Sequence, residues 1–112
     1  MDREIVVPVL PQEEMRMLDS LGYHIPVIGR NEDGSAILKP YGLSEIAGLI
    51  PPEAVFMARK YYLSIDRFTP GVWTVSYTDE PEGETPFKYV QSPSLLDAMY
   101  KFLLTARVMH VI

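Results

Sequence analysis

The side chains in this chain that could carry acid–base chemistry are two histidines, His24 and His110, and several carboxylates. A histidine held beside a carboxylate can act as a general acid or base. No nucleophile elbow, phosphate-binding loop, zinc-protease helix or dinucleotide fingerprint accompanies either histidine. Two histidines are too few for a zinc site without carboxylate help, and the absence of cysteine excludes thiolate ligands, thiol catalysis and disulfides. We therefore expect no metal or cofactor and assign no catalytic residue; a small enzyme built on one histidine and nearby carboxylates is kept as an alternative.

Four carboxylates follow one another in the bridge between two strand-like segments. They are Asp79, Glu80, Glu82 and Glu84. Prolines and a glycine are interleaved with them, which predicts a loop that projects into water, the ordinary role of a charge run. The alternative is a docking loop for a basic partner surface, because clustered carboxylates speed the encounter with positive charge. Calcium is disfavoured, since the spacing does not match that of a known calcium loop.

Residues 44–62 resemble a bacterial helix-turn-helix, with Glu45-Ile46-Ala47 on its first helix. Arg59 and Lys60 would then lie on the helix that reads DNA. Against this, Ile50-Pro51-Pro52 stands where the turn usually has a glycine, and the net charge of −5 opposes binding to phosphate backbones. A helical hairpin that buries its apolar residues is the preferred interpretation, and a DNA-binding regulator is an alternative.

The composition is that of one globular domain over residues 1–112. Hydrophobic residues make up 47% of the chain and charged residues 22%, which is far from the composition of disordered segments. The first residues lack the basic lead and the cleavage site of a secretion signal, and the apolar tracts are too interrupted to span a membrane. A cytoplasmic location is the default expectation.

The first half of the chain predicts a helix, a hairpin and two further helices. A helix over 11–21 would end at Gly22, and a hairpin over 25–40 would turn at Asp33-Gly34. Two short helices would follow, the first capped by Ser44 and both meeting at Pro51-Pro52. Alternatively, residues 56–62 lead into a strand.

The second half predicts an antiparallel sheet. Residues 62–66 and 72–78 alternate in polarity around a turn at 69–71, and residues 87–91 would add a third strand. In 72–78, alternate residues should form a dry face (Trp73, Val75 and Tyr77) and a wet face (Thr74, Ser76 and Thr78). One wet and one dry face is typical of a sheet covered on a single side.

The C-terminal segment predicts a long helix, with Ser92 as its N-cap and Pro93 at its first position. Its polar residues fall on a narrow strip, so the rest of its surface must contact more than one sheet face, either another helix or a second chain. The predicted fold is α+β: a small antiparallel sheet of three or more strands with helices packed on one face and the C-terminal helix central.

These features favour a small non-catalytic protein-interaction or regulatory domain. The expected partner is a protein, with a basic surface where the acidic bridge is used, or a second copy in a homodimer; nucleic acid and membrane are disfavoured. Self-association would use the free flank of the C-terminal helix, which carries Leu96, Tyr100, Leu104 and Val108. Tyr62 and Tyr89 are candidates for an exposed aromatic platform. Stacking of single-stranded nucleic acid on it would need basic neighbours, so a protein contact is preferred.

Overall fold

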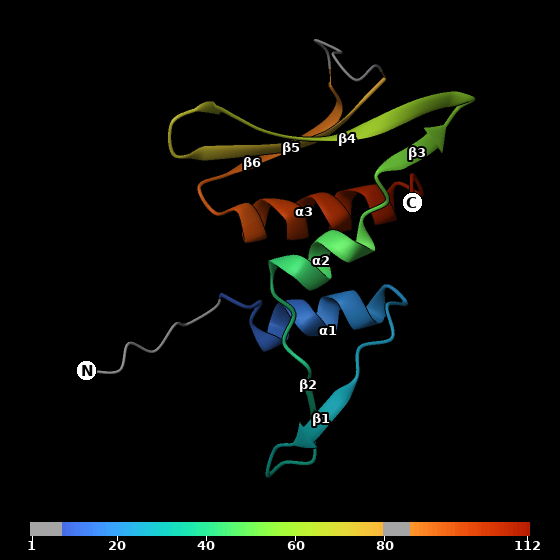
Figure 1. Cartoon of the computed structure of the whole chain (residues 1–112). Coiled ribbons are helices and arrows are strands. Elements are labelled where there is room, and N and C mark those ends of the chain that lie inside the picture. Colours follow the sequence, from blue (N-terminus) through green and yellow to red (C-terminus); the bar gives the residue numbers. More distant parts are fainter. Residues whose placement is uncertain (1–7, 80–85) are drawn as a thin grey trace.

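The computed structural model describes residues 8–79 and 86–112, whose helices and strands are stacked in layers (Figure 1). The helices are α1 (Gln12–Ser20), α2 (Leu43–Leu49) and α3 (Leu95–Val108). The strands are β1 (Val27–Arg30), β2 (Ala36–Leu38), β3 (Glu53–Phe56), β4 (Arg59–Thr69), β5 (Val72–Thr78) and β6 (Pro86–Ser92). Figure 1 shows the larger sheet at the top, α3 directly beneath it, then α2 and α1, and the β1–β2 hairpin at the bottom.

The larger sheet has four strands in the order β3-β4-β5-β6, and every neighbouring pair is antiparallel. The predicted pairing of 62–66 with 72–78 is confirmed, with Ile65 opposite Val75. The predicted turn between them is confirmed too, because Gly71 adopts a φ of +79° that other residues rarely tolerate. Residues 86–92 form the expected further strand, and β3 adds a fourth.

The inner face of this sheet packs on α3. Val75 and Tyr77 of β5 are buried there, and Phe102 of α3 is buried opposite them. The rings of Tyr77 and Phe102 meet edge to face, with 5.0 Å between their centroids and 65° between their planes. Such an aromatic pair stabilises a core by about 0.5–1.5 kcal/mol beyond the burial of its area. The predicted dry layer beneath the C-terminal helix is therefore present at Val75 and Tyr77, whereas Trp73 is only partly buried against the core.

The opposite side of α3 packs on α2. Ile46 and Ile50 are buried on α2 and just after it, and Met15 and Leu18 are buried on α1. The surface of α3 that a single sheet face would leave free is thus largely covered by another helix of the same chain. The α+β fold with a central C-terminal helix is confirmed.

The N-terminal helix and the first hairpin also form as predicted. Gly22 follows the end of α1 with a φ of +95°, and Gly34 turns the β1–β2 hairpin with a φ of +87°. The side-chain amide of Gln12 on α1 donates to the carbonyl of Leu38 at 2.8 Å and accepts from its N–H at 2.9 Å. This pair of hydrogen bonds fastens the hairpin to the helix.

The predicted cap of α2 is wrong. The N-cap is Gly42 rather than Ser44, and the Glu45 carboxylate accepts a hydrogen bond from the Gly42 N–H at 3.2 Å. Position 42 is crowded, because the carbonyl oxygen of Pro8 would lie 3.1 Å from an added Cβ, and Gly42 also forms a β-bridge with Val9. The tertiary approach of the N-terminal segment therefore moves the helix start away from the residue with the best capping propensity.

The predicted second helix after Pro51-Pro52 is also wrong. In its place β3 and β4 form a hairpin whose turn has two residues. Arg59 and Lys60 lie on β4, so the helix-turn-helix over 44–62 does not exist. The β-branched and aromatic residues of this segment suit a pleated surface, and Tyr61 is buried opposite Ala54 on the inner face of the sheet. Among the described residues, no helix is long and apolar enough to cross a membrane.

Candidate functional site

The outer face of the four-stranded sheet is covered by none of the described elements, since all three helices lie on the opposite side (Figure 1). The strand register places one row of side chains across this face, with Ser64 of β4 opposite Ser76 of β5 and Ser76 opposite Tyr89 of β6. A second row contains Asp66, Thr74 and Gln91. We call this surface the outer face.

Small polar side chains form the floor of the outer face. Thr74 and Ser76 are buried although no described helix covers them, and their partners on β6 are the longer residues Gln91 and Tyr89. The predicted alternation is confirmed, but the predicted wetness of these residues is wrong. The Gln91 amide donates to the Thr74 hydroxyl at 3.2 Å, and the Ser64 hydroxyl donates to the Asp66 carboxylate. These hydrogen bonds hold the floor in one arrangement.

Tyr62 and Tyr89 stand at the rim of this floor, two strands apart and offset by two residues along the strands, which separates their backbones by about 12 Å. Tyr89 is 60% exposed. Lys60 lies with its ammonium 5.7 Å from the centre of the Tyr62 ring and 3.1 Å from the Glu53 carboxylate. The hydrogen bond to Glu53 raises the pKa of Lys60, and the Glu53 carboxylate partly neutralises its positive charge. The result is a surface rich in Tyr, Ser and Thr, on which the described charges of Lys60 and Asp66 have polar partners.

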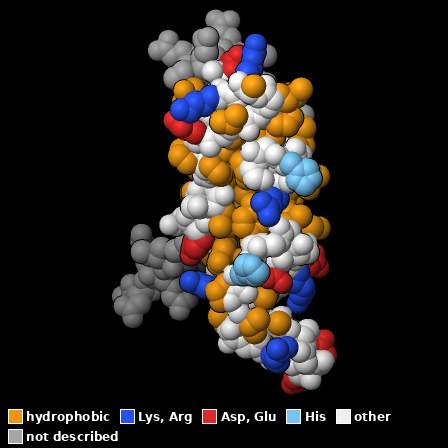
Figure 2. All heavy atoms as spheres, turned by 90° about the vertical axis from the view of Figure 1, so that its right-hand side faces the viewer, with side chains coloured by type: hydrophobic (Ala, Val, Ile, Leu, Met, Phe, Trp, Pro, Cys, Tyr) orange, Lys and Arg blue, Asp and Glu red, His pale blue; other side chains and the backbone are white. Residues whose placement is uncertain are grey.

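The β3–β4 turn displays an apolar tip. Met57 and Ala58 have φ values of 50° and 63°, and the Met57 side chain is 84% exposed. Two-residue hairpin turns of this geometry favour Asn-Gly, and a residue with a Cβ held at positive φ costs on the order of 1 kcal/mol. This strain is not offset by contacts of the Met57 side chain. Figure 2 shows the side of the molecule that carries this turn, with apolar side chains gathered along its length.

A groove lies at the N-terminal end of α3, which we call the α3 groove. Its apolar part has a volume of about 330 Å³ and is lined by Pro8, Leu43, Leu95 and Leu96. An adjoining cavity of about 240 Å³ shares Pro8 and Leu96 and is lined also by carboxylates, those of Glu14 and Asp97. The groove is thus apolar at one end and acidic at the other.

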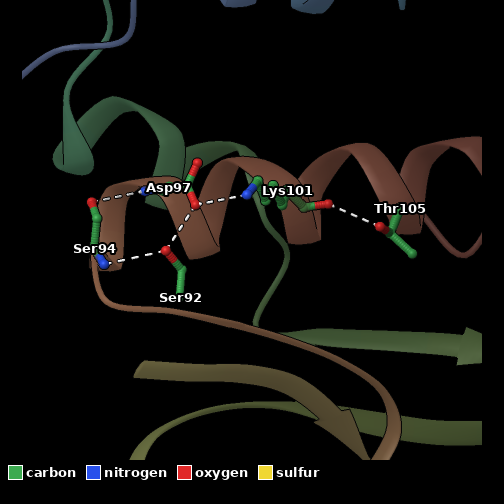
Figure 3. A network of polar contacts seen from close by, with 5 residues as sticks. All are labelled: Ser92, Ser94, Asp97, Lys101 and Thr105. Atoms are coloured by element: carbon green, nitrogen blue, oxygen red, sulfur yellow. Dashed lines mark hydrogen bonds and ion pairs between the residues drawn. The ribbon is translucent and has the colours of Figure 1, made fainter. Parts of the chain in front are cut away.

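A network of polar contacts fixes the helix start beside this groove (Figure 3). The N-cap is Ser94 rather than the predicted Ser92, and Ser94 accepts from the Asp97 N–H at 3.2 Å. Ser92 instead donates to the Asp97 carboxylate at 2.8 Å, and Lys101 forms an ion pair with it at 3.0 Å. The Thr105 hydroxyl donates to the Lys101 carbonyl one turn further on. The strip of polar residues on α3 is therefore an internally bonded series.

The two carboxylates of the groove have opposite pKa shifts. Burial raises the pKa of Glu14, and the nearby charge of Asp97 raises it further, while Lys101 lowers it. Burial alone would raise the pKa of Asp97, but the hydrogen bonds from Ser92 and Lys101 outweigh it and lower the pKa. Lys101 therefore compensates Asp97 more completely than it compensates Glu14.

The acidic bridge lies largely outside the described residues. Glu80, Glu82 and Glu84 belong to the segment that the structure does not describe. Asp79 lies at the end of β5, and its carboxylate is 3.4 Å from the guanidinium of Arg59. The bridge thus begins beside the cations of the β3–β4 hairpin, and its role as a docking loop stays a prediction.

The residues expected to mediate self-association along α3 do not form one exposed flank. Tyr100 is only 6% exposed, whereas Val108 is 65% exposed. Leu96 and Leu104 are half-buried against the core. Leu96 lines the α3 groove.

Neither histidine occupies a concave site among those described. His24 and His110 are both exposed, and neither lines the α3 groove. Figure 2 shows both histidine side chains, in pale blue, projecting from the same face. In the described part of the chain, no three His, Asp or Glu side chains gather as metal ligands would.

No protein-family model, curated protein or solved structure matches this chain. The candidate sites therefore stand on geometry alone. The sequence predicted that Tyr62 and Tyr89 could lie outside the core, because the sheet region contains more aromatic residues than a core requires. It missed the α3 groove and the Met57 tip, because Pro8, Leu43 and Leu95 are far apart in sequence and Met57 was expected on a helix.

Proposed function

We propose that this protein is a small non-catalytic protein-interaction domain that binds a protein partner through the outer face of its sheet. The observation that supports this proposal is the asymmetry of the four-stranded sheet. One face packs on α3, while the other carries Tyr62 and Tyr89 above a floor of hydrogen-bonded Ser and Thr side chains.

The side-chain types of the outer face suit protein recognition. Tyrosine supplies a large amphipathic contact area with little conformational entropy to lose, and serine and threonine supply adaptable hydrogen bonds. Tyrosine is also enriched among the residues that dominate binding energy in protein interfaces. A sheet holds these groups rigidly, so a partner would pay little for ordering them.

The charge of the chain favours a partner with a basic surface. The net charge is −5, and Asp66 lies in the outer face with its carboxylate oriented by Ser64. The one cation described near the rim, Lys60, is already paired with Glu53. Complementary charge accelerates encounter and excludes acidic partners such as nucleic acid.

Site-specific photocrosslinking tests this proposal. A photoreactive phenylalanine analogue replaces Tyr89 in one protein and Val108 in a matched control, since both positions are exposed to a similar extent. After irradiation in a lysate of the source organism, we expect a discrete crosslinked protein from position 89 and none from position 108. The crosslink should weaken when Tyr62→Ala is added, because Tyr62 belongs to the same surface.

Crosslinks of equal yield from both positions would show non-specific contact and contradict the proposal. Crosslinking from position 108 alone would instead move the interface to the C-terminal end of α3. Circular dichroism of each variant checks that the fold is retained, as expected for substitutions of exposed side chains.

A further inference from the structure

The chain carries an exposed apolar side chain at the β3–β4 turn, the Met57 tip, and an apolar groove, the α3 groove. The Met57 tip lies beyond the C-terminal end of α3, and the α3 groove lies at its N-terminal end. The helix has 14 residues and is therefore about 21 Å long. Because this length separates them, the tip of one chain cannot enter the groove of the same chain.

We propose that the protein self-associates head to tail, with the Met57 tip of one copy inserted in the α3 groove of the next. The groove offers about 330 Å³ between Leu43, Leu95 and Leu96, enough for an unbranched side chain. Methionine suits such a site, because its flexible thioether adapts to irregular apolar walls. This inference goes beyond the proposed function and uses none of the residues of the outer face.

The charges around the two features are complementary. Arg59 and Lys60 directly follow the turn, and both side chains are more than half exposed. The acidic end of the groove carries Glu14 and Asp97, and Lys101 is bonded to the latter. Arg59 is paired with Asp79, and Lys60 is paired with Glu53. Both ion pairs are exposed and weak, so Arg59 and Lys60 can exchange partners at small cost. A cation brought to the groove would meet the carboxylate of Glu14, which Lys101 leaves less compensated.

The geometry of the turn supports a role for its tip. Met57 and Ala58 both hold positive φ values, in a turn that Asn-Gly would form with less strain. Strained backbone conformations cluster at functional sites, where the position of a side chain matters. Here the displayed side chain is that of Met57, which is 84% exposed.

A second copy is the occupant that the observations favour, because both halves of the contact occur in one chain. A contact between two different surfaces is heterologous, so it generates an open chain of copies, or a ring where the rotation closes. Few side chains take part, and interfaces of small area are weak. The association should therefore depend on concentration.

Sedimentation velocity over a wide concentration range tests the proposal. The full-length chain should increase in mean mass with concentration, and should do so less at high salt, because exposed charges are screened. Met57→Asp removes the tip, and Leu43→Asp places a charge in the wall of the groove; each should keep the chain monomeric. An equimolar mixture of the two variants should form a one-to-one complex, since one supplies an intact groove and the other an intact tip.

The matched control is Met17→Asp, which changes an exposed methionine on α1 that belongs to neither feature. It should associate like the unchanged chain. A chain that stays monomeric at every concentration overturns the proposal and leaves the groove to a different ligand. Association of Met57→Asp equal to that of the control also overturns it, as does a mixture of the two variants that stays monomeric.

The double variant Met57→Asn, Ala58→Gly separates folding from association. It installs the residues that the turn geometry prefers, so its melting temperature should rise. Association should be lost at the same time, because the apolar tip is gone. A more stable protein that still associates would overturn the proposal.

Discussion

The two faces of the four-stranded sheet are made from alternate residues of the same strands, yet they are built on different principles. On the inner face, Val75 and Tyr77 are buried by the volume of α3, and the ring of Phe102 fills the space between layers. On the outer face, Thr74 and Ser76 are also buried, although no described helix is stacked on them. Low exposure is thus found both beneath a second layer and on a face that no described helix covers. We expect stability to depend on the side chain mainly in the first case.

The largest expected effect is the difference in the free energy of unfolding between truncating a side chain at the inner face and truncating one on the outer face. Phe102→Ala removes a buried ring from the inner layer and should lower the free energy of unfolding by about 3–5 kcal/mol. Tyr89→Ala removes an exposed ring from the outer face and should change it by no more than about 0.5 kcal/mol. Urea denaturation monitored by circular dichroism measures both. Equal losses from the two variants would mean that the outer face is covered in solution.

The second effect is an alkaline loss of stability from the inner face. Burial raises the pKa of Tyr77 to about 12, with a smaller contribution from Tyr23. Its hydroxyl donates to the Pro51 carbonyl at 2.7 Å. Between pH 10 and pH 12 the unfolded chain releases the Tyr77 proton and the native chain keeps it. The free energy of unfolding should therefore fall as the pH rises through this range, by up to about 1.4 kcal/mol per pH unit from this group.

Tyr77→Phe is the control for the alkaline effect. It keeps the ring contact with Phe102 and removes the titrating hydroxyl, so the fall above pH 10 should become shallower by up to about 1.4 kcal/mol per pH unit. Some fall should remain, because burial also raises the pKa of Tyr23 and of Tyr100. At neutral pH the variant should lose about 0.5–1.5 kcal/mol with its hydrogen bond to Pro51. An unchanged alkaline slope would place the titration elsewhere.

Regular patterns in the sequence predicted most of the fold. The alternation in 72–78 predicts β5 and the composition of its two faces, and the apolar circumference of 95–108 predicts a helix with contacts on two sides. The turns with Asp33-Gly34 and Pro70-Gly71 predict their hairpins because glycine tolerates positive φ. In each case the local preference and the tertiary structure agree.

The errors fall where tertiary contacts override local preference. Residues 53–62 lack a turn signal, since Met57-Ala58 is an unusual pair for a two-residue hairpin, and pairing with the rest of the sheet decides their conformation. Ser44 is the better cap by propensity, but the approach of Pro8 selects Gly42. The α3 groove could not be predicted for the same reason, because it is formed by segments that meet only in the folded chain.

The smallest effect provides the sharpest comparison, because valine and threonine are exchanged in opposite directions at two neighbouring positions. Position 75 lies on the inner face and position 74 on the outer face. Val75→Thr keeps the shape of the side chain and places a hydroxyl in the inner layer, which should cost about 1–3 kcal/mol. Thr74→Val makes the reverse change on the outer face. It removes the hydroxyl that accepts from the Gln91 amide, but Gln91 is exposed and water can replace the lost partner. The free energy of unfolding should then change by no more than about 0.5 kcal/mol. Urea denaturation of both variants measures the difference, and a Thr74→Val loss as large as that of Val75→Thr would show that the outer face is a second core rather than a surface available to a partner.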